Sequence, residues 1–173
     1  ATSRYQALKA AAGSLDFADL LVRARDLIRG NAEVRRHLQQ KFRRIFVDEF
    51  QDTDPIQAEI LLLLAADDPA TTDATAAIPI PGKLFIVGDP KQAIYRFRGT
   101  DVATYWRVAT QLSASGGRLV QLQTSYRSVP AIQRFVNAAF AAEMTRDTRT
   151  LQSDYVPLSP YRDDDQSQPA IVA

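Results

Sequence analysis

Two adjacent carboxylates, Asp48 and Glu49, have the clearest chemical use of any residues in this sequence. They follow the short apolar run Ile45–Val47, which is typical of a buried strand in a parallel sheet. A helix start comes next, with Asp54 as the N-cap and Pro55 at the first helical position. In open α/β sheets, ligands bind outside the carboxyl ends of the strands. At such a place one acid can hold Mg²⁺ and the other can activate a water that attacks a phosphate. An isolated acidic pair is more often a solvated loop, but the strand before it and the cap after it favour a site.

A second group of chemically useful residues follows the apolar run 83–87, which predicts another strand. The amide of Gln92 lies just past this strand end, where it can hydrogen-bond a terminal phosphate. Tyr95 and Phe97 then alternate with arginines, of which Arg98 is one. Aromatic faces stack on bases at about 1–3 kcal/mol each, and arginines meet phosphates, which suits single-stranded nucleic acid. The alternative for the two aromatic residues is a buried pair.

Strands and helices alternate along the predicted chain, which indicates an α/β fold with a parallel sheet flanked by helices. A third strand is expected at 118–122 and a fourth at 169–173. Residues 67–81 are rich in Asp, Thr, Ala and Pro without a helical or strand period, and predict a flexible surface insertion. Helices are expected over residues 3–12, 17–29, 32–40, 55–66, 101–112 and 130–140.

The composition is that of an ordinary folded domain, with 173 residues, 46% hydrophobic and 24% charged. The formal net charge of +1 gives no global basic field, so nucleic-acid contact requires a local patch. There is no cysteine, and His37 is the single histidine, so disulfides, thiolate sites and multi-histidine zinc sites are excluded. His37 is expected on a solvated helix face. No transmembrane run or signal peptide is visible, which predicts a soluble, cytoplasmic protein without a membrane partner.

Three stretches of the chain resemble motifs of the UvrD/Rep-like superfamily 1 DNA helicases, in the family's order. Val47–Thr53 is similar to motif II, Gly88–Gly99 to motif III and Thr124–Ser128 to motif IV. Pro90-Lys91 after the motif III glycine, and Phe97 in place of the usual tryptophan, look like the RecB/AddA branch of recombination and repair helicases.

This resemblance implies an ATP-dependent DNA helicase that uses Mg²⁺ and translocates on single-stranded DNA in repair or recombination. By its motifs, Asp48 binds Mg²⁺ and Glu49 is the general base for water. Gln92 and Arg127 contact the γ-phosphate, with Arg127 as an arginine finger, and Tyr126 stacks on the adenine. The implied DNA contacts are Tyr95, Phe97 and Arg98.

No Gly-x-x-x-x-Gly-Lys-Ser/Thr phosphate-binding loop (Walker A) occurs in the sequence. The expected fold is therefore a partial RecA-like P-loop NTPase domain whose P-loop strand is missing. Residues 1–43 would return from an inserted helical subdomain, 44–127 would form part of the first RecA-like domain, and 128–173 would begin the second with a polar loop. We expect an internal fragment, inactive alone, whose partners are single-stranded DNA and the rest of the helicase chain. A nuclease domain or a partner subunit is a further candidate.

Two alternatives from other classes stay open at this point. One is a non-catalytic module that binds single-stranded DNA through the motif III aromatic residues. The other is a Mg²⁺-dependent nuclease that uses Asp48, Glu49 and Asp52; it would need a further acid or a lysine at the same metal, and the sequence offers no convincing one.

Overall fold

The structure is a computed structural model that describes residues 2–95, 97, 99–145, 147 and 152–164. The chain divides into two compact units, unit 1 (residues 1–118) and unit 2 (residues 119–173), each described by itself below. The sequence predicts its last domain boundary nine residues later, between 127 and 128. In the part of the chain that the structure covers, no helix is both long and apolar enough to cross a membrane.

Three helices of unit 1 begin where the sequence predicts them, because their caps are in place, and the other two begin within one residue of the prediction. Asp16 and Asp54 each form a capping box, with Asp19 and Gln57 respectively as the third helical residue. Asn31 caps the next helix by accepting hydrogen bonds from two backbone N–H groups. The helices are α1 (Thr2–Ala12), α2 (Phe17–Gly30), α3 (Ala32–Lys41), α4 (Pro55–Ala65) and α5 (Val102–Ala114).

Two of the predicted strands, β1 (Ile45–Val47) and β2 (Leu84–Ile86), pair in parallel as expected. Ile45 lies opposite Leu84 and Val47 opposite Ile86, so the carboxyl ends of both strands meet at one edge. One face of this pair packs on the core through Ile45, Val47 and Ile86. The other face is exposed and carries Phe46 and Phe85 with their ring centroids 5.8 Å apart.

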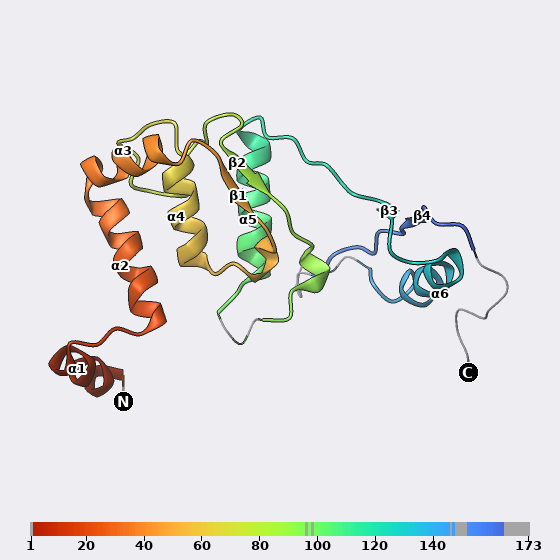
Figure 1. Cartoon of the computed structure of the whole chain (residues 1–173), viewed down its shortest axis with the longest axis horizontal. Helices are drawn as coiled ribbons and strands as arrows, with labels where there is room; N and C mark the ends of the chain where they lie inside the picture. The colour runs from red at the N-terminus through yellow and green to blue at the C-terminus, as the bar shows by residue number, and fades with distance from the viewer. Residues whose placement is uncertain (1, 96, 98, 146, 148–151, 165–173) are drawn as a thin grey trace. The chain divides into compact units, whose positions relative to one another are not determined.

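The core of unit 1 is built around α4, which packs against α2, α3 and α5 (Figure 1). Ala58, Leu62 and Leu63 on α4 are completely buried, and Ile28 and Val108 reach them from α2 and α5. A helix that is apolar on most of its faces is expected at such a central position. The result is an α/β unit whose small sheet is supported by helices on one face.

Residues 67–81 contain no helix and no named strand, but they pack more closely on the rest of unit 1 than is expected of a flexible surface insertion. Ala74 and Ala77 are buried in the core cluster. Their backbone oxygens accept hydrogen bonds from Gln111 Nε2 on α5, at 2.8 and 2.7 Å. Pro79 bridges back to Ala66 at the end of α4. Buried alanines and hydrogen bonds to backbone groups thus hold in place a segment whose sequence has no helical or strand period.

Unit 2 contains α6 (Pro130–Phe140) and a two-residue parallel pair, β3 (Thr124–Ser125) with β4 (Ser159–Pro160). The predicted strand at 118–122 was wrong. This stretch pairs with nothing in the part of the chain that the structure describes, and its apolar side chains Leu119, Val120 and Leu122 are 71%, 62% and 81% exposed. A strand-forming sequence needs a neighbouring edge to pair with. The strand predicted at 169–173 lies outside the described residues.

Candidate functional site

The two carboxylates lie in a tight turn at the carboxyl end of β1. Glu49 adopts the left-handed conformation, with φ 50° and ψ 43°, and begins the short 3₁₀-helix η1 (Phe50–Asp52). A non-glycine residue held there costs about 1–2 kcal/mol, and such strain clusters at functional sites. The turn is fixed by Phe50 N, which donates to Val87 O at 3.0 Å, and by Asp52 N, which donates to Glu49 O at 2.9 Å.

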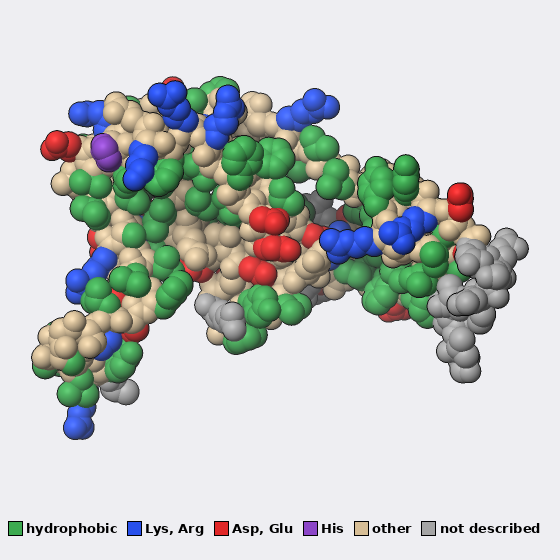
Figure 2. Space-filling view, viewed as in Figure 1, with side chains coloured by type: hydrophobic (Ala, Val, Ile, Leu, Met, Phe, Trp, Pro, Cys, Tyr) green, Lys and Arg blue, Asp and Glu red, His purple; other side chains and the backbone are tan. Residues whose placement is uncertain are grey.

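Both carboxylates are exposed and only partly engaged by protein groups. Asp48 Oδ1 accepts the Glu49 N–H at 2.9 Å, and Glu49 Oε2 accepts Gln51 Nε2 at 2.6 Å. Each keeps a second oxygen without a hydrogen bond to any described residue. Figure 2 shows acidic side chains gathered on the face of unit 1 that displays β1 and β2 in Figure 1. Mg²⁺ takes one or two carboxylates together with water and phosphate oxygens, so this donor set fits that ion.

Gln51 joins the ends of the two strands, and sequence reasoning did not single it out. Its side chain is buried, with 2% exposed. While Nε2 donates to Glu49, Oε1 accepts the backbone N–H of Asp89 at 3.0 Å, two residues after Val87. Its only sequence signal was its place inside the motif II stretch. Gln51 therefore fixes the Glu49 side chain relative to the loop that follows β2.

Gly88 lets the two strand ends approach each other. A Cβ on Gly88 would lie 3.0 Å from Gln51 Oε1, 3.1 Å from Phe50 N and 3.2 Å from Tyr105 Cε2. The Tyr105 hydroxyl donates to Gly88 O at 3.3 Å from α5. Burial, and secondarily the negative charge of Asp89, raise the pKa of Tyr105, which keeps this donor protonated. Close packing therefore favours glycine here, because any larger side chain would press on these neighbours.

Asp89 organises the loop after β2, which continues as the short 3₁₀-helix η2 (Pro90–Gln92). Its Oδ1 accepts from Lys91 N at 3.0 Å and pairs with Lys91 Nζ at 2.9 Å, while its Oδ2 accepts from Gln92 Nε2 at 3.2 Å. Burial alone would raise the pKa of Asp89, but the hydrogen bonds from Lys91 and Gln92 outweigh it and lower the pKa. Gln92, predicted to contact phosphate, is thus exposed but held by Asp89.

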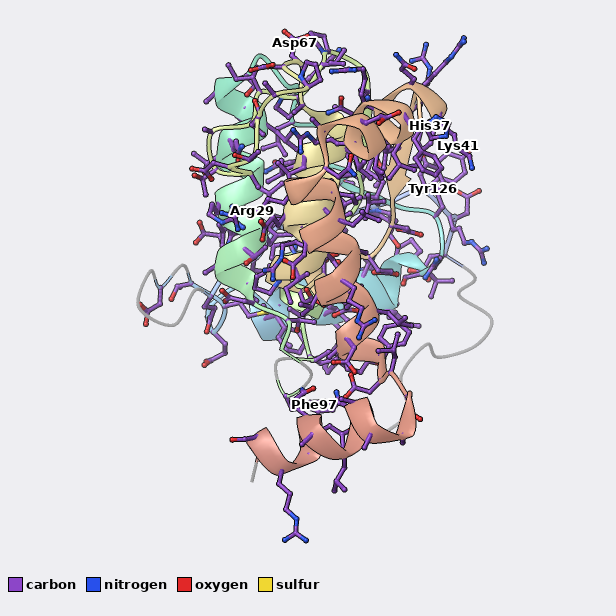
Figure 3. The ribbon with its side chains drawn as sticks, turned by 90° about the vertical axis from the view of Figure 1, so that its left-hand side faces the viewer. Arg29, His37, Lys41, Asp67, Phe97 and Tyr126 are labelled. Carbon is purple, nitrogen blue, oxygen red and sulfur yellow. The ribbon has the colours of Figure 1, made fainter. Side chains whose placement is uncertain are left out.

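The motif III aromatic residues do not form the buried pair that was the alternative. Phe97 is 80% exposed, and Tyr95 is half-buried with its ring in edge contact with Phe97 at 6.0 Å. Figure 3 shows Phe97 far from His37 and Lys41, which lie on α3. His37 is exposed, as predicted. Arg98, the third predicted DNA contact, lies outside the described residues.

The remaining predicted site residues, Tyr126 and Arg127, belong to unit 2 and directly follow β3. Tyr126 is 62% exposed, with its ring centroid 4.7 Å from that of Tyr161, and its backbone oxygen accepts Arg162 Nε at 2.8 Å. Arg127 is exposed. The structure thus brings Asp48 and Glu49 together with the loop that carries Gln92, whereas the motif IV residues are placed only within their own unit.

Asp52, the third acid of the nuclease alternative, has a buried Oδ1 without a hydrogen-bond partner among the described residues. Over the same part of the chain, no group of three or more His, Cys, Asp or Glu side chains is arranged to hold a metal ion. The structure therefore offers no observation that favours the nuclease.

This geometry defines an α/β protein in which two carboxylates lie at the carboxyl end of a parallel strand. Comparison with protein families makes the assignment specific, because residues 1–113 match the UvrD/REP helicase N-terminal domain. The chain belongs to this family.

Individual relatives agree with the family and include both branches suggested by the motifs. The chain is 36% identical over 163 residues to DNA helicase II of Salmonella typhimurium, covering 91% of this chain and 21% of that protein. It is 32% identical to an ATP-dependent helicase/nuclease subunit of Pediococcus pentosaceus (82% of this chain, 11% of that protein). It is 38% identical to the RecBCD enzyme subunit RecB of Mycolicibacterium smegmatis (69% and 10%). The chain therefore spans between a tenth and about a fifth of these relatives' lengths.

Proposed function

We propose that the protein acts as part of an ATP-dependent DNA helicase that couples Mg-ATP hydrolysis to movement along single-stranded DNA. The observation that carries the proposal is the exposed pair Asp48 and Glu49 at the end of β1, tied to the end of β2 by Gln51. Family membership and the relatives, which are named helicases, support it. The whole protein would serve in DNA repair or recombination, as the resemblance of its motif III to the RecB/AddA branch implies.

Asp48 and Glu49 divide the chemistry in this proposal. Asp48 would hold Mg²⁺ through the carboxylate oxygen that its backbone contact leaves available. The ion, when bound, would neutralise phosphate charge. Glu49 would orient the attacking water and take its proton on Oε1, because Oε2 is already held by Gln51 at 2.6 Å. Gln51 acts here as a positioning residue that fixes the direction of the base.

The loop after β2 would connect the nucleotide to the DNA. Gln92 would exchange its 3.2 Å hydrogen bond to Asp89 for one to the γ-phosphate. Tyr95, Phe97 and Arg98 follow within six residues and would contact the DNA strand, with the exposed Phe97 ring stacking on a base. A change at Gln92 would then reach the aromatic contact along a very short stretch of backbone.

Motif IV and a segment outside these 173 residues would complete the nucleotide site. Tyr126 would stack on the adenine, and Arg127 would reach the γ-phosphate as an arginine finger. The phosphate-binding loop would come from elsewhere in the protein, and this chain would contribute motifs II to IV of a RecA-like domain. A nuclease domain or a partner subunit would be a further component, since one relative is named as part of a helicase/nuclease and another as part of the RecBCD enzyme.

The test is steady-state ATP hydrolysis by the full-length gene product with and without a single-stranded oligonucleotide. The expected result is DNA-stimulated turnover that Glu49→Gln lowers about 100-fold or more. Glu33→Gln, which changes an exposed acid on α3, is the matched control and is expected to turn over as the wild type does. DNA binding with no ATP hydrolysis in the wild type would refute the proposal and favour the non-catalytic binding module.

A further inference from the structure

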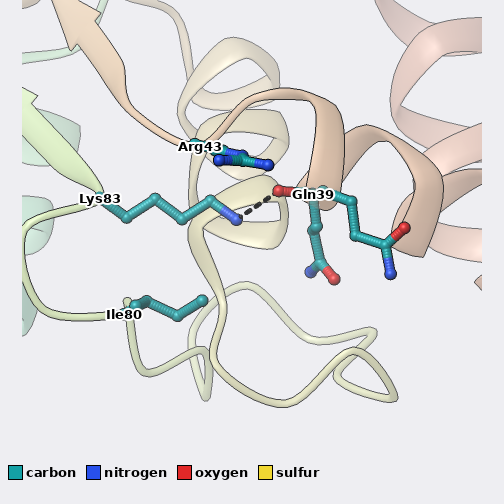
Figure 4. Close-up of a pocket in the computed structure, with 5 residues that line it drawn as sticks. Gln39, Arg43, Ile80 and Lys83 are labelled. Atoms are coloured by element: carbon teal, nitrogen blue, oxygen red, sulfur yellow. Dashed lines mark hydrogen bonds between the residues drawn. The ribbon is translucent and has the colours of Figure 1, made fainter.

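A hollow of unit 1 lies at the amino ends of the two strands, the end of the sheet opposite to Asp48 and Glu49. Its volume is about 470 Å³, and its lining comes from the end of α3, the link to β1 and the approach to β2 (Figure 4). Two cationic side chains meet there, Lys83 just before β2 and Arg43 just before β1. The other lining residues are Gln39, Gln40 and Ile80.

Lys83 is the unusual member of this lining because its side chain is buried, with only 5% exposed. Its Nζ donates one hydrogen bond, to Gln39 O at 3.0 Å, and an ammonium carries three donors. Burial lowers the pKa of Lys83, as expected for a cation that has lost water without gaining an acid. Figure 4 shows the Arg43 guanidinium on one side of this hydrogen bond and Ile80 on the other. Two cations thus share one hollow whose other lining residues carry no negative charge.

The surroundings do not neutralise this charge. Lys41, Arg43, Arg44 and Lys83, which we call the basic edge, take part in no ion pair among the described residues. Residues 34–47 and 74–88, which form the region, contain no Asp or Glu. Asp67 lies at the same end of unit 1 (Figure 3), but no ion pair joins it to the basic edge. Figure 2 shows Lys and Arg side chains along this edge, where Figure 1 places α3 and the starts of the strands.

The end of α3 explains only part of this arrangement. The partial negative charge at a helix C-terminus favours nearby cations, which accounts for Lys41 and for one donor of Lys83. Arg44 reaches the backbone of Gly82 at 3.4 Å. Arg43 has no hydrogen bond or ion pair to any described residue, and it is exposed beside the buried ammonium. The C-terminal end of α3 therefore accounts for Lys41 and Lys83 but not for Arg43.

We propose that the basic edge is a second DNA-binding site, in which Lys83 and Arg43 hold a phosphate of the DNA backbone. An oxyanion in the hollow would accept the donors that Lys83 leaves unused and a fork of two from Arg43. The site takes backbone and not bases, because the lining of the hollow offers two cations and no aromatic ring on which a base could stack. Duplex DNA, with its higher charge density, is the preferred form.

This site is separate from the proposed single-strand contacts. Figure 3 shows Phe97 far from Lys41 within unit 1. A protein that holds single-stranded DNA at one end and duplex backbone at the other would be anchored on both sides of a strand junction. The inference concerns residues that play no part in the proposed ATP chemistry, so it stands or fails independently of that chemistry.

The test measures the affinity of the 173-residue chain for a fluorescent 20-base-pair duplex by fluorescence polarisation. The measurement is repeated at several salt concentrations between about 50 and 200 mM. Arg43→Glu is expected to weaken binding about fivefold or more and to reduce the slope of log K against log salt by about one. Arg23→Glu, the same charge reversal at an exposed arginine of α2, is the matched control and should change binding less than twofold. Arg43 is exposed and makes no hydrogen bond or ion pair with a described residue, so its variant should fold.

A reporter inside the hollow complements the binding assay. Ile80 lines the hollow, so its δ1-methyl NMR signal should shift when the duplex is added, and the shift should disappear in Arg43→Glu. Equal weakening by both charge reversals, or no duplex binding at the lowest salt, would overturn the proposal. So would a shift of the Ile80 signal by inorganic phosphate or by a polyglutamate peptide but not by the duplex, since the hollow would then serve free phosphate or an acidic protein segment.

Discussion

Replacing Gln51 by methionine tests whether this side chain holds the two strand ends together. Methionine has a similar volume but makes neither of the two hydrogen bonds. The bond to the Glu49 carboxylate would normally contribute about 1.5–3 kcal/mol, and the exposure of Glu49 places it at the lower end. The Asp89 N–H, left without its acceptor, costs about 1–3 kcal/mol. We therefore expect Gln51→Met to lower the free energy of unfolding of unit 1 by about 2–4 kcal/mol.

Urea unfolding of the 173-residue chain, followed by tryptophan fluorescence, measures this quantity. The single tryptophan, Trp106, is on α5 and its ring is 5.3 Å from that of Tyr105, so it reports on unit 1. Gln6→Met, at an exposed position of α1, is the matched control and should stay within about 0.5 kcal/mol of the wild type. A Gln51→Met chain as stable as this control would refute the bridging role.

An exchange of partners separates the two bonds of Gln51. Gln51→Glu keeps the acceptor for Asp89 N but places a second carboxylate beside Glu49, where the heavy atoms now lie 2.6 Å apart. Adding Glu49→Gln restores the hydrogen bond, with the side chain at position 49 now donating and the one at position 51 accepting. The double variant is therefore expected to recover at least half of the stability that Gln51→Glu loses. No recovery would mean that the loss arises from something other than this bond.

Three further predictions follow from the packing and electrostatics of unit 1. Gly88→Ala should lower the free energy of unfolding by about 1–3 kcal/mol in urea, because its Cβ would press on three neighbours between 3.0 and 3.2 Å away; an unchanged midpoint would show that the strand ends yield freely. Arg35→Met should cost about 2–4 kcal/mol in the same assay, since the buried guanidinium donates to the oxygens of Ile28, Arg29 and Pro69, whereas Arg36→Met on the exposed face should be neutral. The side-chain hydrogen bond from Lys9 and the capping bond lower the pKa of Asp16 from 3.8 to about 2. The stability that these bonds contribute is therefore present above about pH 4 and is lost as the pH falls toward 2. Circular dichroism should show that Lys9→Met reduces this loss of stability at acid pH, and an unaltered pH dependence would contradict the pairing.

Local signals in the sequence were sufficient for the elements that position the site. The acids capping α2 and α4 and the Pro at the start of α4 define helix starts through backbone chemistry alone, so they could be read directly. The apolar runs at β1 and β2 are short, but a buried parallel strand needs only such a run. The acidic turn at 48–49 then follows from where β1 ends.

Features that depend on tertiary contacts could not be read in this way. Arg35 lies in the polar sequence of α3, and its burial arises because the end of α2 and Pro69 present carbonyl groups to it. Gln51 is one polar residue among several in its turn, and its role depends on Asp89, 38 positions later. The apolar stretch at 118–122 has the composition of a strand but finds no edge to pair with among the described residues.

Separating ATP binding from ATP hydrolysis tests the proposed role of the acidic turn most directly. In the full-length gene product with single-stranded DNA, Glu49→Gln is expected to bind ATP within about threefold of the wild type, because the amide keeps the volume of the carboxylate. Its single-turnover hydrolysis is expected to fall about 100-fold or more, because an amide cannot take a proton from water. Hydrolysis at the wild-type rate with ATP bound would contradict the assignment of Glu49 as the base, and with it the chemistry proposed for this turn.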